Sequence, residues 1–162
     1  MRRSAEPIET HREEQNRSRP RFRSVAAHPE DESAVRSLLA RMADAWARGD
    51  ARAYAECFTE DSDYVTFNGI HLRGRAENRD AHGPLFRGVL KGTRIDASVT
   101  DLSFLSAEIA LVHTAGSARG KSLQTFVIVK RDGEWRVRAF QNTRVRPLSV
   151  WITRQMVRRA SR

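Results

Sequence analysis

Residues 46–74, WARGDARAYAECFTEDSDYVTFNGIHLRG, decide the fold of this chain. They contain, in order, the end of one helix, a short second helix, an acidic turn and a β-hairpin. Gly49 can adopt the left-handed conformation that closes the first helix, and Asp50 can accept backbone N–H bonds at the start of the second. The sequence therefore predicts two helices that meet at a sharp corner.

The second predicted helix, residues 51–58, has one apolar side. Tyr54 and Phe58 lie four positions apart with Cys57 beside them, so this side is expected to be buried. Cys57 is the single cysteine of the chain, which excludes an internal disulfide. It could serve as a nucleophile, but its position favours the interpretation as a small core residue.

A hairpin follows the acidic turn. Residues 64–67 are β-branched or aromatic, as is typical of a strand. The Asn-Gly pair after them favours a tight turn, and residues 70–73 are expected to form the returning strand.

The regions on both sides of this stretch also have helical patterns. Upstream, apolar residues recur at helical spacing from Glu30 onward, which predicts a long first helix with Asp31 or Ser33 as its cap. Downstream, residues 77–87 predict a third helix. Pro84 weakens it, because proline removes a backbone N–H and favours a kink.

Strands dominate the rest of the chain. Four runs have strand character: residues 94–105, 108–118, 122–130 and 135–143. An Asp-Gly turn joins the last two. Three helices followed by long antiparallel strands predict an α+β fold in which a curved sheet wraps around the helices. A cone built in this way has an open, partly apolar mouth, which is a common position for a ligand pocket.

The length of 162 residues fits one domain with tails. Residues 1–29 are polar and contain three prolines, so a flexible N-terminal tail is expected there. Residues 30–146 would form the domain. Residues 147–162 form a basic C-terminal tail with apolar residues near helical spacing. Packing of that apolar side on the domain or on a partner subunit is favoured over contact with a membrane surface or a polyanion.

The formal charge of +9 invites a comparison with nucleic-acid-binding proteins. Residues 30–146, however, contain 18 basic and 16 acidic side chains, so most of the excess lies in the tails. The predicted domain therefore has no strong field toward phosphate, and nucleic-acid binding is not the expected function. The sequence also lacks a secretory signal and an apolar stretch of membrane-spanning length, so no membrane partner and a cytoplasmic location are expected.

The order of motifs along the chain resembles one known family. The motifs are W-x-x-G-D, Tyr54, F-T-E-D-S-D-Y, a glycine hairpin, a G-R pair, H-x-x-L-F and finally D-G-E-W-R-V-R-A-F-Q-N-T-R. This order resembles the SgcJ/EcaC branch (DUF4440-type) of the SnoaL-like, NTF2-like superfamily. The resemblance implies an NTF2-like cone with three N-terminal helices packed in a curved antiparallel sheet, and a homodimer that pairs through the sheet face. It also implies a small apolar or aromatic ligand of the polyketide kind.

Fold alone does not define activity, because the superfamily includes cyclases, isomerases, epoxide hydrolases and association domains. Ketosteroid isomerase members place a base Asp on the first hairpin strand, where this chain has Thr66. Polyketide cyclase members use a carboxylate near the last strands, where this chain has Gln141 and Asn142. The resemblance to those two mechanisms is accordingly weak.

Two side chains are candidates for acid–base catalysis. His82 lies on the third predicted helix, and the apolar residues just after it suggest that this segment faces the cavity. Asp63 lies at the entrance of the first hairpin strand, near the family's cavity or its rim. Each also has a structural interpretation: His82 as a satisfied core histidine, and Asp63 and its neighbour Asp61 as acids that bond local backbone N–H groups.

Further residues are candidates for ligand binding. Trp46, Tyr64, Phe67 and Phe86 would supply apolar and aromatic walls. Gln141 and Asn142 could orient a carbonyl or hydroxyl group, or could simply end the strand. Strict alternation puts Gln141 on the side of Trp135 and Val137, and Asn142 on the side of Phe140, so at most one of the two can line the cavity.

Neither a metal site nor a cofactor is expected. The histidines in predicted strands have no Asp, Glu or Cys at ligand spacing, and the chain has no glycine-rich phosphate loop. Two hypotheses follow. The first is a SnoaL-like pocket protein that rearranges, cyclises or hydrolyses a polyketide or related secondary metabolite with Asp63 and His82. The second is a dimeric binding or association module without chemistry.

Overall fold

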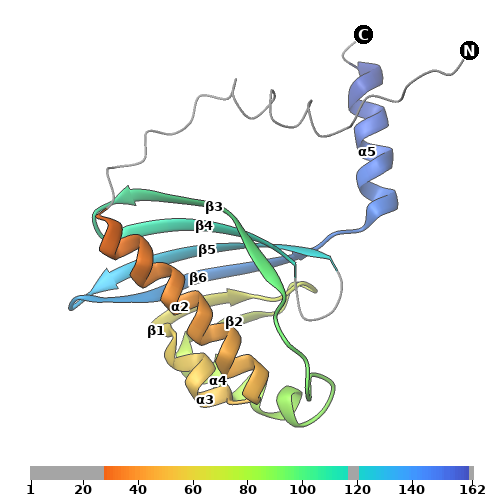
Figure 1. The fold of residues 1–162 in the computed structure, drawn as a ribbon. Helices are drawn as coiled ribbons and strands as arrows, with labels where there is room; N and C mark the ends of the chain where they lie inside the picture. Colours follow the sequence, from red (N-terminus) through yellow and green to blue (C-terminus); the bar gives the residue numbers. More distant parts are fainter. Residues whose placement is uncertain (1–27, 117–120, 161–162) are drawn as a thin grey trace, which may run out of the picture.

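The computed structural model describes residues 28–116 and 121–160. Helices α2, α3 and α4 come first, a six-stranded sheet follows, and α5 lies at the C-terminal end (Figure 1). The helices are α2 (Pro29–Arg48), α3 (Ala51–Glu56), α4 (Gly74–Arg87) and α5 (Pro147–Ala160). The strands are β1 (Phe58–Val65), β2 (His71–Arg73), β3 (Ala97–Ser106), β4 (Ile109–Gly116), β5 (Ser122–Arg131) and β6 (Glu134–Arg144). The predicted α+β class is confirmed.

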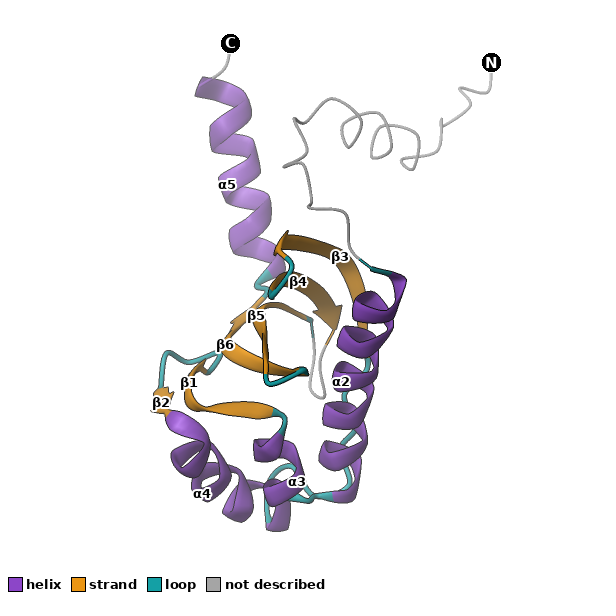
Figure 2. Cartoon of the chain, turned by 90° about the vertical axis from the view of Figure 1, so that its left-hand side faces the viewer, coloured by secondary structure: helices purple, strands orange, loops and turns teal. Residues whose placement is uncertain are grey.

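The sheet is curved, and α2, α3 and α4 lie on one side of it (Figure 2). Its strand order is β2-β1-β6-β5-β4-β3. All neighbouring strands are antiparallel except β1 and β6, which run parallel. This parallel pair arises because the hairpin formed early in the chain adds to the edge of the last strand, and sequence patterns alone do not specify that contact.

The predicted corner between the first two helices is confirmed. Gly49 ends α2 with φ of 67°, and its N–H donates to carbonyls of the last turn. Asp50 accepts a hydrogen bond from the backbone N–H of Ala53 at 2.9 Å and so caps α3. A left-handed glycine and a capping aspartate thus set the direction of both helices within two residues.

The first turn of α2 differs from the prediction. Asp31 does not cap the helix; its buried carboxylate accepts hydrogen bonds from Lys130 Nζ at 2.8 Å and Trp135 Nε1 at 3.0 Å. These bonds lower the pKa of Asp31 below its ordinary value. The carboxylate therefore ties the start of α2 to β5 and β6 rather than to its own backbone.

The expected acidic turn is in fact part of a strand. Helix α3 ends at Glu56, two residues earlier than predicted, and β1 begins at Phe58. Phe58 pairs with Val137 of β6, and Arg75 Nε donates a hydrogen bond to the carbonyl of Phe58 at 2.8 Å. Contacts with distant segments thus impose an extended conformation on a polar run whose own strand propensity is low.

A β-bulge in β6 shifts its alternation. Val137 is opposite Ile128, whereas Ala139 is opposite Val127, so Arg138 is the extra residue. Trp135 and Val137 face the core before the bulge, and Phe140 and Asn142 face it after the bulge. The sequence prediction that assumed strict alternation was therefore wrong for the end of this strand.

The two predicted tails differ in what the structure describes. Residues 1–27 of the predicted N-terminal tail lie outside the described residues. At the other end, α5 extends away from the rest of the domain (Figures 1 and 2), and Leu148, Trp151 and Met156 are more than half exposed. Among the helices of the described residues, none is long and apolar enough to cross a bilayer.

Candidate functional site

A cavity of about 470 Å³ lies between the helices and the inner face of the sheet. Helix α2 contributes Leu39, Met42 and Trp46, and the sheet contributes Tyr64, Phe126 and Phe140. The exposed lining residues mark its mouth: Phe67, Asn68, Ile70, Leu85, Val89, Lys121 and Arg144. Volume and apolar lining are those of a site for a small organic molecule.

Strand register arranges the inner face of the sheet in two rows. The deeper row is apolar and aromatic, because Val112, Phe126, Phe140 and Tyr64 are successive partners across four strands. A second row lies two positions further along these strands, nearer the mouth. It is polar and consists of strand partners in the same way: Thr114, Gln124 and Asn142. The wall of the cavity therefore changes from aromatic to polar toward its opening.

His82 lines the cavity from α4 and is buried, with 3% exposure. Asn78, His82 and Phe86 lie four residues apart and form the buried side of this helix. Nδ1 of His82 lies 2.8 Å from the carbonyl oxygen of Asn78. Because a carbonyl can only accept, Nδ1 carries the proton and Nε2 keeps its lone pair. Burial lowers the pKa of His82 below its ordinary value, so the imidazole is neutral at pH 7.

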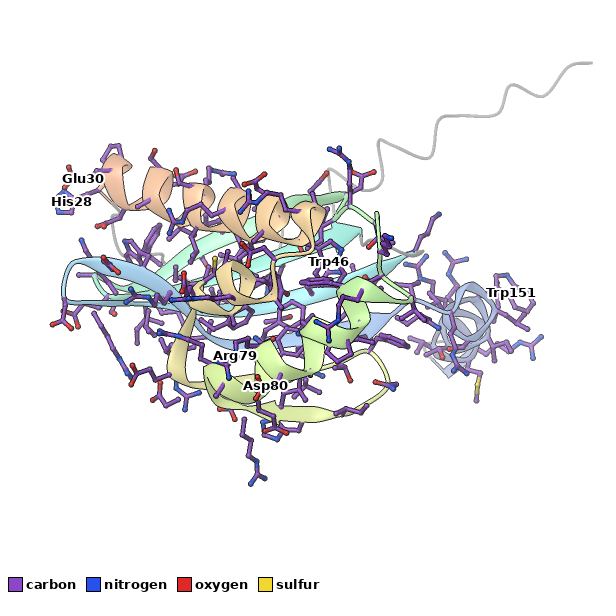
Figure 3. All side chains as sticks on the ribbon, turned by 90° about the horizontal axis from the view of Figure 1, so that it is seen from below. His28, Glu30, Trp46, Arg79, Asp80 and Trp151 are labelled. Carbon is purple, nitrogen blue, oxygen red and sulfur yellow. The ribbon has the colours of Figure 1, made fainter. Side chains whose placement is uncertain are left out.

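Aromatic rings surround His82. Tyr54 and Tyr64 have ring centroids at 4.9 and 5.2 Å from the imidazole, and Trp46 and Phe86 at 5.8 and 5.6 Å. Figure 3 shows Trp46 between α2 and α4, and Trp46 Nε1 donates to Thr93 Oγ1 at 3.0 Å. This packing holds the imidazole in one orientation against the cavity.

The two tyrosines whose rings lie beside this histidine bring their hydroxyls close together. The hydroxyl oxygens of Tyr54 and Tyr64 are 3.5 Å apart, and both residues line the cavity. Burial raises the pKa of Tyr64 to about 12 and that of Tyr54 well above its ordinary value. Both hydroxyls therefore keep their protons and can donate hydrogen bonds. Sequence reasoning assigned Tyr54 only to the core; its helical spacing indicated burial and gave no sign that the buried side borders a cavity.

Asp63, the second predicted catalytic residue, lies outside the cavity. Its neighbours in β1, Ser62 and Tyr64, point inward, so Asp63 points outward. It pairs with Arg138 Nη1 at 2.6 Å and His71 Nε2 at 2.8 Å on that face. The hydrogen bonds from Arg138 and His71 lower the pKa of Asp63. The structure does not bring Asp63 together with His82.

The predicted ligand-binding residues divide in a similar way. Trp46, Tyr64, Phe67 and Asn142 line the cavity. Phe86 is buried behind the wall, where it supports Trp46 at a ring distance of 5.0 Å. Gln141 is exposed on the outer face, opposite Thr125, because the bulge in β6 turns it away from the side of Trp135 and Val137. The prediction that at most one of Gln141 and Asn142 lines the cavity leaves open which of the two it is.

The polar row contains residues that sequence reasoning missed. Thr114 donates to Gln124, whose side-chain nitrogen donates to Ser122 Oγ and to the carbonyl of Gly116. The side-chain oxygen of Asn142 is buried and has no hydrogen-bond partner among the described residues. The alternation of β4 and β5 placed these side chains on one face, but only the register of the assembled sheet aligns them.

Other chemistry finds little support in the described part of the chain. No three His, Cys, Asp or Glu side chains there lie close enough together to hold a metal ion. Cys57 is buried, its thiol lies 3.5 Å from the carbonyl of Ala53, and burial raises its pKa. A protonated, enclosed thiol is a poor nucleophile.

Comparison with known proteins agrees with this geometry. A crystal structure from Nostoc punctiforme, described as a domain of unknown function with a cystatin-like fold, is 33% identical with a TM-score of 0.70; the match covers 79% of this chain and 85% of that one. An NTF-2 like protein from Shewanella oneidensis is 19% identical with a TM-score of 0.63, over 70% of this chain and 98% of that one.

A ketosteroid isomerase-like protein from Erwinia carotovora atroseptica has the same fold, with 16% identity and a TM-score of 0.62; the match covers 74% of this chain and 100% of that one. No curated protein matches the chain. The model of the SnoaL-like domain matches residues 35–140, which is most of the chain. This range includes strands β1 to β5 and the part of β6 up to Phe140. The chain therefore belongs to the SnoaL-like domain family, and its curved sheet and helices form the NTF2-like cone.

Proposed function

We propose that the cavity binds a small, largely apolar organic carbonyl compound and that His82 moves a proton on it without a cofactor. The observation that carries this proposal is a neutral, oriented imidazole packed against the rings of two tyrosines with protonated hydroxyls, in an apolar cavity that all three residues line. General acid–base catalysis needs this combination of a base with a lone pair and donors for developing charge. The resemblance to the SgcJ/EcaC branch supports an aromatic polyketide or related secondary metabolite as the ligand.

In the proposed reaction, Nε2 of His82 takes a proton from the carbon next to the carbonyl group. The electron pair of that C–H bond forms the enolate, whose oxygen accepts a hydrogen bond from Tyr64 or Tyr54. Return of the proton to a different carbon isomerises the ligand. If a hydroxyl group leaves from the neighbouring carbon instead, the proton from His82 completes a water molecule and the result is dehydration.

A second candidate is a binding module that holds such a ligand without changing it. One observation favours it: among the described lining residues there is no carboxylate, so His82 would have to act with only a carbonyl group as its partner. The two candidates share the ligand class and differ in whether a proton moves.

We also propose that the chain forms a homodimer through the outer face of its sheet. Among the described residues, helices cover only the inner face (Figure 2), and the outer face carries partly exposed apolar side chains. The register places Leu111, Val127 and Ala139 in one row there, each partly exposed. A second copy of the same face would remove this row from water.

The test of proton transfer uses tetralone, a bicyclic aromatic ketone with exchangeable protons next to its carbonyl group. In D₂O, NMR should show that the protein accelerates exchange of these protons, and His82→Gln should slow the exchange by about 100-fold or more, the usual effect of removing a general base. Tetralone should still raise the melting temperature of the variant, because the apolar walls remain.

His71→Gln is the matched control, since His71 lies on β2 outside the cavity lining. It should leave exchange at the wild-type rate. If tetralone stabilises the wild-type protein but its protons exchange no faster than in buffer, the binding module is the correct function. If tetralone neither stabilises the protein nor exchanges, the proposed ligand class is wrong.

A further inference from the structure

We propose that the ligand of this cavity is an organic anion whose negative group lies at the mouth, between Arg144 and Lys121, while its apolar body lies against the aromatic row. This inference rests on the proposed function insofar as it assigns the ligand to the same cavity. It adds the charge of the ligand and the direction in which it enters.

The order of side chains along the inner face gives the direction. The aromatic row, which includes Phe126 and Phe140, lies deepest, and the polar row of Thr114, Gln124 and Asn142 comes next. One step further out, Arg144 lies opposite Ser122 on the same inner face. Successive layers are therefore apolar, hydrogen-bonding and cationic, so a molecule with an apolar end and an anionic end matches the wall in only one orientation.

Two cations lie at this outer layer. The guanidinium carbon of Arg144 lies 4.0 Å from the centroid of the Phe67 ring, in a cation–π contact that keeps it over the mouth. Lys121, the residue just before β5, lines the same mouth, and its carbonyl accepts the backbone N–H of Val145, the residue after Arg144. Strand pairing thus fixes the two backbones that carry these charges next to each other.

The described lining residues include no Asp or Glu, and within the described chain neither Arg144 nor Lys121 forms an ion pair. The nearest polar groups on the wall are neutral amides and hydroxyls. A carboxylate at the mouth can therefore accept charge-assisted hydrogen bonds from both cations without repulsion from the lining. Asn142, whose buried oxygen has no partner among the described residues, lies beside this position and can bond a second polar group of the ligand.

The position of the negative group at the mouth also keeps the desolvation cost of the ligand's carboxylate low. A carboxylate deep among Tyr64, Phe126 and Phe140 would lose its hydration, whereas one at the mouth keeps part of it. Arg144 and Lys121 are both exposed, so the ion pairs would remain sensitive to salt. Discrimination between charged and neutral ligands should accordingly be moderate rather than absolute.

The experiment compares naphthoic acid with its methyl ester, which has the same rings and no charge. Titration calorimetry on the full-length protein at low salt should show that the acid binds about tenfold or more tightly, the effect expected for hydrogen bonds to charged groups. Raising the salt concentration should weaken binding of the acid and leave the affinity for the ester unchanged. In the double variant Arg144→Gln/Lys121→Gln, acid and ester should bind alike, with the ester within about twofold of wild type.

Arg146→Gln is the control for loss of a positive charge near the mouth, because Arg146 is exposed, lies two residues after Arg144 and does not line the cavity. It should keep the preference for the acid. If the wild-type protein binds the ester as tightly as the acid, the anion proposal is overturned while the cavity proposal stands. The anion proposal is likewise overturned, and the cavity proposal stands, if the double variant still binds the acid more tightly than the ester. Failure of both compounds to bind would overturn both proposals.

Discussion

At the scale of single residues, His82 shows how burial defines a chemical role. The hydrogen bond from its Nδ1 to the carbonyl of Asn78 selects one tautomer, and the packing of Tyr54 and Tyr64 buries the ring. The same environment opposes protonation, because a charged imidazole would lose its hydration there. A single side chain therefore links ligand chemistry to folding stability.

This link predicts how stability depends on pH. The pKa of His82 is lowered in the folded protein, whereas in the unfolded chain it has its ordinary value of about 6.5. Below that pH the unfolded chain binds a proton that the folded protein does not, so folding stability falls as pH drops through 6.5 toward the folded-state pKa. Urea unfolding between pH 7.5 and pH 5 should show a smaller loss in His82→Gln than in wild type. Equal losses would contradict the buried neutral state.

At the scale of secondary-structure elements, α4 depends on a glycine at its start. Gly74 has φ of 80°, and a Cβ atom there would lie 2.8 Å from the carbonyl oxygen of Glu60 in β1. The residue thus serves two purposes: it turns the chain from β2 into α4 and lets the helix approach β1. Because His82 lies two turns further along α4, this approach also sets the depth of the imidazole in the cavity.

Gly74→Ala should therefore be costly. The left-handed conformation costs an alanine about 1–2 kcal/mol, and relief of the contact with Glu60 should add roughly 1–3 kcal/mol. Gly133→Ala is the matched control, with φ of 79° and nothing within 4 Å of the added atom, so it should show only the conformational cost. Chemical denaturation measures both. Equal effects of the two substitutions would show that α4 moves away from β1 at little cost.

At the scale of the whole molecule, the sheet has one face inside the cone and one face outside. Val127 and its strand partner Leu111 leave apolar surface on the outer face, and the exposed residues of α5 form a separate apolar surface away from it (Figures 1 and 3). The first surface belongs to the domain that the family shares, and the second to the C-terminal extension. Substitutions can therefore distinguish which of the two brings copies of the chain together.

Val127→Glu should convert a dimer into a monomer, because it places a charge at the centre of the proposed interface without a partner. Light scattering after size-exclusion chromatography measures the change against the chain mass of 18.4 kDa. Ile152→Glu places the same charge on α5 and should leave the dimer intact. A monomeric wild-type protein would exclude the dimer, and dissociation by Ile152→Glu alone would assign the interface to α5.

The sequence determined the features that depend on neighbouring residues. The helix corner at Gly49 and Asp50, the strands from residue 97 to residue 144 and the α+β class all follow from local capping, turn chemistry and periodicity. It also indicated that the sides of the helices carrying His82 and Trp46 face inward, and both residues line the cavity. The expectation of a cavity there came from the family resemblance and not from the helical spacing.

The tertiary structure alone decided the features that depend on contacts between distant segments. The parallel pairing of β1 with β6 made a strand of the polar run after Phe58, and the bulge at Arg138 exchanged the faces of Gln141 and Asn142. The direction of Asp63, the depth of Tyr54 and the polar row on the cavity wall were set in the same way. Strand register is a property of pairs of segments, and a shift of one residue moves every following side chain to the other face of the sheet.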